Sequence, residues 1–235
     1  MPTCFLTRVR LRRDANVAAL ARVLLPQDEG AKTVAAHSLI WSLFAGDREA
    51  KRDFLYREEG RTRGGRFTIL SQRRPHDDIG LFEMDEAKEF APALRAGEKL
   101  CFALRVNPTI DRRESNRSRS VRSDVIMHQL KAVKHGERSL LRDSTAREAT
   151  LAWLKAQGLR SGFVLDDVEQ SFRVDGYDQV RLPRDKGKPI LFSRIDIEGL
   201  LIVTDPSSFV SKVIKGFGKA KAFGCGLMLI RRARR

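Results

Sequence analysis

Two stretches of the sequence carry side chains that could do chemistry, and the first surrounds His37. His37 lies near the start of an amphipathic segment, Ala35–Phe44, where an imidazole can face a ligand. With an ordinary pKa of about 6.5, it can donate or accept a proton near neutrality, as reaction at a ribose 2′-hydroxyl or a leaving 5′-oxygen requires. A single histidine without a neighbouring catalytic motif is more often structural, so the residue alone leaves both roles open.

The second stretch is a glycine-rich segment, residues 216–226. Glycine lacks a Cβ and reaches positive φ cheaply, so a polyanion can approach the main-chain N–H groups of such a loop closely. Lysines within the segment add positive charge. The predicted contacts to a phosphate backbone are Gly216, Gly218, Lys219, Lys221, Gly224 and Gly226. The apolar run Leu227–Ile230 predicts a strand that would anchor the loop.

A third basic region, Asn107–Arg122, is rich in arginine and serine and holds almost nothing apolar. Its predicted RNA contacts are Arg112, Arg113, Arg117, Arg119 and Arg122. Such composition predicts a solvated or disordered loop whose guanidinium groups contact phosphates and that could become ordered on binding nucleic acid. The alternative is a solvated loop without a specific partner.

The charge of the whole chain favours a polyanionic partner. Lys and Arg number 45 against 30 Asp and Glu, which gives a formal net charge of +15. Nucleic acid and anionic membranes would both attract such a protein. No apolar run approaches the roughly 20 residues of a bilayer span, and the first residues lack a signal core. We therefore expect a cytoplasmic protein that has no membrane partner.

Neither cysteine nor histidine spacing indicates a bound metal. Cys4, Cys101 and Cys225 lie far apart, so we expect buried thiols in a reducing compartment. No Cys, His and Asp cluster has metal-ligand spacing, and no Walker-type loop is present. We expect no metal and no cofactor.

The elements that must position these residues follow a βαββαβ order that occurs twice. The first unit has strands at 3–11, 53–57 and 66–71, a helix at 33–44, and a stretch where a short helix and a fourth strand near 87–94 would complete the order. The second has strands at 99–106, 163–173, 190–203 and 226–232 and helices at 145–157 and 207–215. This pattern predicts an α+β chain of two tandem ferredoxin-like, or RRM-like, domains. The predicted domains are residues 1–95 and 96–235, so His37 and the glycine-rich loop lie in different domains.

Four parts of the sequence resemble one known family. They are His37–Phe44 with Lys51–Tyr56; Phe102–Thr109; Trp153–Leu154 with Gly162–Phe163; and Gly199–Asp205 with Gly216–Leu227. In this order and spacing they resemble the CasE subfamily of CRISPR RNA-processing endoribonucleases. The glycine-rich end alone would indicate only the broader group of repeat-RNA processing proteins.

The resemblance implies a fold, an activity and partners. It implies two ferredoxin-like domains and a metal-independent hydrolase that cuts the stem-loop of a CRISPR repeat, leaving a 2′,3′-cyclic phosphate and a 5′-hydroxyl. It also implies that the protein stays bound to the mature crRNA among the other subunits of a type I-E Cascade complex for antiviral defence. The family's principal catalytic residue, a histidine of the first helix, corresponds to His37, as general acid or general base.

One position departs from the family. Its members carry a tyrosine three residues before the histidine, whereas this chain has Val34, about one helical turn from His37. Tyr56, Ser38, Ser42 or a nearby lysine could supply the missing hydrogen bond. The departure keeps an alternative open, a non-catalytic or weakly catalytic subunit that binds hairpin RNA. A generic basic RNA-binding protein of ribosomal type would explain the charge but not the order of the four motifs.

Overall fold

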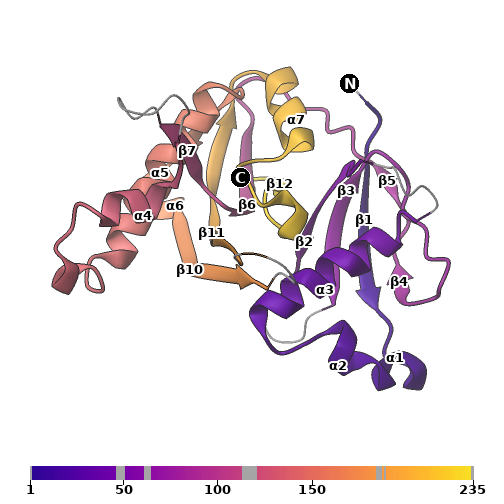
Figure 1. Cartoon of the computed structure of the whole chain (residues 1–235). Helices are drawn as coiled ribbons and strands as arrows, with labels where there is room; N and C mark the ends of the chain where they lie inside the picture. Colours follow the sequence, from indigo (N-terminus) through magenta and orange to yellow (C-terminus); the bar gives the residue numbers. More distant parts are fainter. Residues whose placement is uncertain are drawn as a thin grey trace.

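The computed structural model describes residues 2–45, 51–60, 65–112, 121–183, 187 and 189–233. Within these residues the main features are two antiparallel sheets that lie next to each other, each with helices packed on it (Figure 1). The α+β class and the tandem arrangement of two ferredoxin-like units are confirmed. No helix in the described part of the chain is both long enough and apolar enough to cross a membrane.

The first sheet has the strand order β2–β3–β1–β4, and β5 also pairs with β1. Its strands are β1 (Phe5–Leu11), β2 (Phe54–Glu58), β3 (Arg66–Ser71), β4 (Phe82–Met84) and β5 (Lys88–Glu89). The helix α3 (Glu29–Ser42) crosses this sheet (Figure 1), after two short helices, α1 (Ala15–Ala19) and α2 (Ala21–Leu24). Leu39 and Ile40 of α3 are buried against apolar residues of β1, β2 and β3. Burial of one such side chain contributes about 1.5–3 kcal/mol.

The expected second helix of this unit is absent, which corrects the prediction. Residues 79–87, where that helix would lie, are all described and form the end of a turn, the strand β4 and irregular structure. The carboxylate of Asp77 accepts hydrogen bonds from the main-chain N–H groups of Leu81 and Phe82, at 3.2 and 2.6 Å. This Asp-capped turn favours a tight return to the sheet over a helix.

The second sheet has the order β10–β11–β6–β12, and β9 also pairs with β11. Its strands are β6 (Lys99–Val106), β9 (Phe163–Asp166), β10 (Arg173–Leu182), β11 (Ile190–Val203) and β12 (Met228–Arg232). The longer helices are α5 (Arg142–Leu159) and α7 (Pro206–Lys215); the shorter ones are α4 (Val125–Leu130), α6 (Val168–Ser171), η1 (His135–Glu137) and η2 (Lys221–Phe223). Alternating burial along β6 matches the period of a strand with one buried face.

The strand expected at 163–173 is interrupted, which is a second correction. The backbone of Asp167 adopts a left-handed conformation with φ of 43°, and the short helix α6 follows it. Pairing with β11 then resumes along β10, which extends to Leu182. The apolar pattern of the sequence does not predict a left-handed backbone at Asp167. Asp can adopt this conformation because its short polar side chain forms local hydrogen bonds, and this property leaves no trace in hydrophobic periodicity.

The arginine-rich region contains a hairpin. The strands β7 (Thr109–Arg112) and β8 (Val121–Asp124) pair, so Arg112 and Arg122 lie on strands. This corrects the expectation of a wholly solvated or disordered loop at its two ends. Arg113, Arg117 and Arg119, and the side chains of Arg112 and Arg122, lie outside the described residues.

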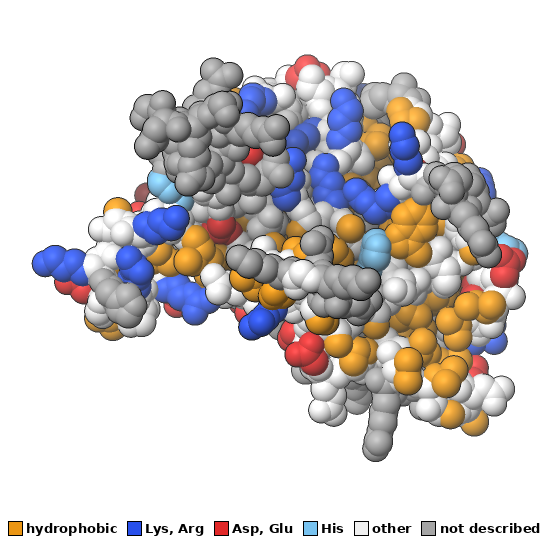
Figure 2. Space-filling view, viewed as in Figure 1, with side chains coloured by type: hydrophobic (Ala, Val, Ile, Leu, Met, Phe, Trp, Pro, Cys, Tyr) orange, Lys and Arg blue, Asp and Glu red, His pale blue; other side chains and the backbone are white. Residues whose placement is uncertain are grey.

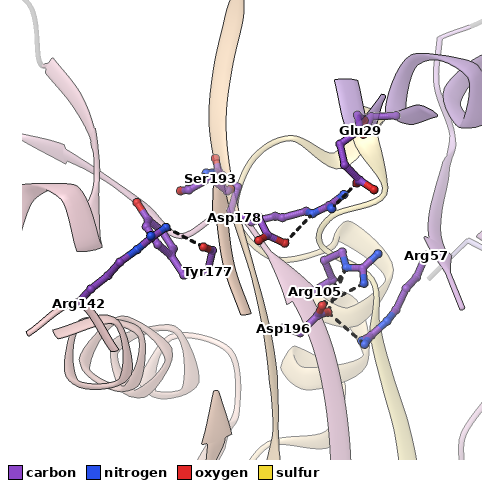
Figure 3. A network of polar contacts seen from close by, with 11 residues as sticks. Glu29, Arg57, Arg105, Arg142, Tyr177, Asp178, Ser193 and Asp196 are labelled. Atoms are coloured by element: carbon purple, nitrogen blue, oxygen red, sulfur yellow. Dashed lines mark hydrogen bonds and ion pairs between the residues drawn. The ribbon is translucent and has the colours of Figure 1, made fainter. Parts of the chain in front are cut away.

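The two units pack on each other through apolar and ionic contacts. Leu55 and Leu70 of the first unit belong to the same buried cluster as residues of the second sheet. Close to this cluster, the carboxylate of Asp196 accepts hydrogen bonds from Arg105, at 3.0 Å, and from Arg57 on β2, at 3.2 Å (Figure 3). Arg194 also binds Glu29, the first residue of α3, at 2.7 Å. These ion pairs connect β2 and the start of α3 to the second sheet.

The domain limits at 1–95 and 96–235 remain a prediction. The first sheet contains residues 5–89 and the second contains residues 99–232, and the proposed boundary falls between them.

Candidate functional site

His37 lies on the part of α3 that faces the second unit. The carboxylate of Asp28 caps the start of α3 by accepting a hydrogen bond from the N–H of Ala31, at 2.8 Å. Leu39 and Ile40 turn into the core, which leaves His37 half-buried on the neighbouring face. The sequence pattern therefore orients the imidazole through the residues that must be buried around it.

Trp41 binds the imidazole one helical turn further along. The indole Nε1 of Trp41 donates a hydrogen bond to Nε2 of His37, at 3.1 Å. The Trp41 ring is itself held edge-on against Phe54, with 5.1 Å between the ring centroids. Because an indole N–H can only donate, Nε2 of His37 must be unprotonated in this arrangement.

The surroundings of His37 favour its neutral form. Burial lowers the pKa of His37 below its usual value, and the charge of Arg52 lowers it further, whereas the Ala222 carbonyl acts in the opposite direction. Nδ1 of His37 is buried and has no hydrogen bond of regular geometry to any described residue. The neutral imidazole thus carries its proton on Nδ1 and its lone pair on Nε2.

The glycine-rich loop crosses to the first unit and meets His37. The ring of Phe223 lies 5.7 Å from the imidazole, between centroids. The hydroxyl of Tyr56, on β2, donates a hydrogen bond to the carbonyl of Ala222 at 3.1 Å. The two candidate stretches, which are far apart in the sequence and lie in different units, are therefore neighbours in the fold.

Backbone geometry explains the glycines at two positions. Gly218 has φ of 64°, and a Cβ there would lie 2.5 Å from the carbonyl oxygen of Asn107. Gly226 has φ of 94°, and a Cβ would lie 2.7 Å from the carbonyl oxygen of Phe217. Only glycine combines positive φ with such close main-chain approach.

The internal hydrogen bonds of the loop bear on the predicted phosphate contacts. The N–H of Gly226 donates to the carbonyl oxygen of Arg105, at 2.7 Å, and that of Gly216 donates to the carbonyl oxygen of Lys212, at 2.8 Å. Gly216, Gly224 and Gly226 are buried, whereas Lys219 is exposed. Contact with RNA remains a prediction for all six residues. The exposed side chain of Lys219 is available for it, whereas Nζ of the half-buried Lys221 donates to the carbonyl of Lys215 at 2.6 Å.

Positive charge is concentrated around the loop. Burial lowers the pKa of Lys212, and the charges of Arg160, Lys215 and Lys219 lower it further. Burial likewise lowers the pKa of Lys221, followed by the charges of Lys212, Arg52 and Lys219. Figure 2 shows Lys and Arg side chains gathered on this face, over the region that α7 and the loop occupy in Figure 1. Cations that repel each other in this way favour a bound polyanion.

Sequence reasoning missed several members of this basic cluster. They are Arg52, Arg160, Lys212 and Lys215. Lys212 and Lys215 stand in the last turn of α7, just before the glycines, and this position could have indicated them. Arg52 lies two residues before the strand β2 within a matched motif, but nothing in the local pattern distinguished it from Arg57 on that strand.

The arginine-rich hairpin begins beside the loop. Asn107 forms a β-bridge with Lys219, whose main-chain N–H donates to the carbonyl oxygen of Asn107 at 3.2 Å. The strand β7 starts two residues later, at Thr109. The base of the arginine-rich region therefore adjoins the basic cluster.

Most substitutes for the missing tyrosine are already engaged. Val34 is 39% exposed and offers no hydrogen bond. The hydroxyl of Tyr56 is buried and bound to Ala222, and burial raises its pKa above the usual value. The hydroxyl of Ser42 donates to the carbonyl of Leu39 at 2.8 Å. Ser38 is exposed on α3 and is the hydroxyl that stays available.

This arrangement combines a proton-transfer group with an anion-binding surface. A neutral imidazole stands beside a loop that carries lysines, a combination suited to chemistry on a phosphodiester. Among the residues that the structure describes, no group of three or more His, Cys, Asp or Glu is arranged to hold a metal ion.

Comparison with known proteins identifies relatives of the whole chain. A family model described as CRISPR associated protein matches residues 4–232. The Cascade subunit CasE of Escherichia coli (strain K12) is 23% identical over 210 residues, which cover 89% of this chain and 96% of that protein. The CRISPR-associated endoribonuclease Cse3 of Thermus thermophilus is 29% identical over 160 residues, 65% of each chain.

A solved structure extends the similarity to the fold. The structure of Thermus thermophilus Cse3 bound to an RNA representing a pre-cleavage complex has a TM-score of 0.69 and 21% identity. The match covers 97% of this chain and 99% of that chain. The resemblance to the CasE subfamily is confirmed.

Proposed function

We propose that this chain, which belongs to the CRISPR associated protein family, is an endoribonuclease that cuts the repeat hairpins of CRISPR precursor RNA. The product would stay bound, with other Cascade subunits as partners, as the similarity to CasE suggests. The observation that carries the proposal is the contact between His37 and the loop that bears Lys219 and Lys221. A polyanion bound along those lysines would pass the imidazole.

In the proposed reaction the ribose 2′-oxygen forms a bond to the adjacent phosphorus, and the bond from phosphorus to the 5′-oxygen breaks. The 2′-hydroxyl loses a proton and the 5′-oxygen gains one, which leaves a 2′,3′-cyclic phosphate and a 5′-hydroxyl. The lowered pKa of His37 favours its neutral form, so we assign it as the general base. Because Nε2 is bound to Trp41 in the free protein, the 2′-hydroxyl would replace the indole as its partner.

Metal independence is part of the proposal and has a direct test. The purified protein is incubated in excess chelator with a labelled hairpin from the CRISPR repeat of the source genome. His37→Ala is the test variant. His76→Ala is the matched control, because the His76 side chain is exposed and its Nε2 lies 3.0 Å from the carboxylate of Asp78 in a turn.

We expect one cut with a cyclic phosphate end from the parent and from His76→Ala. His37→Ala should bind the hairpin but lose cleavage by about 10²–10⁴-fold, the usual contribution of general acid–base catalysis. Equal cleavage by His37→Ala would contradict the assignment of the base. Cleavage that needs added metal would contradict metal independence.

One observation favours a second function, a hairpin-binding subunit with little or no cleavage. Val34 provides no hydroxyl at the position one helical turn before His37. The lone pair of His37 Nε2, which would accept the proton, is bound to the indole of Trp41. Both functions predict tight binding. In the same experiment, a parent that binds the hairpin without forming product would establish the second function.

A further inference from the structure

The proposed reaction needs a group that stabilises negative charge beside His37. As the 2′-oxygen attacks, charge builds up on the phosphate oxygens, and fixed donors aimed at those oxygens supply much of the catalysis in such reactions. Val34 supplies no donor, and the hydroxyl of Tyr56 is bound to Ala222. This inference rests on the proposed function and asks which residue takes that role.

Arg52 lies beside the aromatic ring that holds the partner of His37 in place. It precedes β2, and its guanidinium donates from Nη1 to the carbonyl of Phe54. The guanidinium carbon lies 6.0 Å from the centroid of the Phe54 ring, the same ring that holds Trp41 in place. Trp41, which contacts this ring, is bound to His37, so the Phe54 ring connects Arg52 to the imidazole. The charge of Arg52 also lowers the pKa of His37 and of Lys221.

The neighbouring carboxylate of Asp53 acts on Arg52 through its charge, but it forms its ion pair with Arg73. Asp53 binds Arg73 through both carboxylate oxygens, at 2.7 and 2.9 Å. No carboxylate in the described ranges forms an ion pair with Arg52, although it is half-buried. A partly desolvated guanidinium without a carboxylate partner is a strong site for a phosphate oxygen, because its N–H groups match the geometry of an oxyanion.

We propose that Arg52 is a catalytic residue that donates hydrogen bonds to a non-bridging oxygen of the scissile phosphate. It stays charged throughout and transfers no proton. In the step that forms the bond from the 2′-oxygen to phosphorus and breaks the bond to the 5′-oxygen, it stabilises the added negative charge. Arg52 thereby supplies a hydrogen bond to the phosphate in place of the hydroxyl that position 34 lacks.

The test uses single-turnover cleavage of the repeat hairpin by Arg52→Gln and Arg52→Lys. A hairpin with a 2′-deoxy residue at the cut site, which cannot react, measures binding separately. Arg74→Gln is the matched control, because Arg74 also lies over an aromatic ring, Phe5, at 4.3 Å, and donates to a carbonyl, that of Ala87. Thermal unfolding checks that each variant is folded.

We expect Arg52→Gln to slow cleavage by about 10²–10³-fold, with a much smaller change in affinity for the unreactive hairpin. Arg52→Lys should recover part of the rate, because it keeps the charge but not the planar fork. The pKa of His37, followed by NMR, should rise in Arg52→Gln because the neighbouring positive charge is gone.

Three other results would overturn the inference. An unchanged rate in Arg52→Gln excludes the catalytic role while the proposed function stands. A loss of affinity as large as the loss of rate makes Arg52 a binding residue only. A parent that binds but does not cut overturns the proposed function and the role of Arg52 together.

Discussion

The indole N–H of Trp41 donates to Nε2 of His37 across one turn of α3, at 3.1 Å. This bond exists only while Nε2 is unprotonated, since a protonated Nε2 would face the indole with a second donor. Trp41 therefore selects the tautomer of His37 and opposes formation of the imidazolium. It is a positioning residue, whose ring is fixed by Phe54.

Replacing Trp41 by Phe should raise the pKa of His37 and weaken its preference for a proton on Nδ1. The substitution keeps an aromatic ring and removes the donor that favours the neutral form. Nitrogen NMR across a pH titration measures both quantities. Trp153→Phe is the control, because its indole donates instead to the carbonyl oxygen of Thr109 in the second unit, at 3.2 Å. An unchanged His37 titration in Trp41→Phe would show that the bond has no influence.

Replacing Lys219 and Lys221 by Ala should weaken hairpin binding and reduce its salt dependence. Each phosphate contact contributes about −0.7 to −0.9 to the slope of log affinity against log salt, so losing two contacts flattens the slope by roughly 1.4 to 1.8. Filter binding at several salt concentrations gives the slope. Lys155→Ala, an exposed position on α5, is the control. Parallel slopes for the double variant and the parent would exclude phosphate contacts by these lysines.

Replacing Gly218 by Ala should destabilise the loop. The new Cβ would lie 2.5 Å from the carbonyl oxygen of Asn107, and φ is 64°. Gly80→Ala is a close control, because Gly80 has φ of 68° and nothing within 4 Å. Both variants carry the cost of positive φ, about 1–2 kcal/mol, so the difference in unfolding free energy isolates the clash. If both variants lost the same unfolding free energy, the loop around Gly218 would accommodate the Cβ without a measurable energetic cost.

Replacing Gly30 by Ala should reduce cleavage by shifting the helix that carries His37. A Cβ at Gly30 would overlap the carbonyl oxygen of Arg181 on β10, at the junction of the two units. We expect a loss of stability of about 1–3 kcal/mol, as for overpacked sites, together with slower cleavage. Gly136→Ala, where nothing lies within 4 Å, serves as the control. Cleavage and unfolding identical to those of the parent would show that the junction adjusts freely.

The sequence by itself determined the fold class, the tandem units and several elements. The strands β3, β6 and β11 were predicted with the observed bounds, because each carries a continuous apolar or alternating pattern that local periodicity records. The motif around His37 and the glycine-rich loop also stood out locally. Their residue types, rather than their surroundings, indicated proton transfer and phosphate binding.

Only the tertiary structure decided how these parts meet. It placed the loop against His37, bound Tyr56 to Ala222, and paired Asp53 with Arg73 so that Arg52 has no carboxylate partner among the described residues. These relationships depend on how two sheets pack and on which partner each charge finds across the junction. Local sequence patterns do not predict these pairings. Each charged residue has several possible partners of opposite charge, and only long-range packing brings one of them into contact.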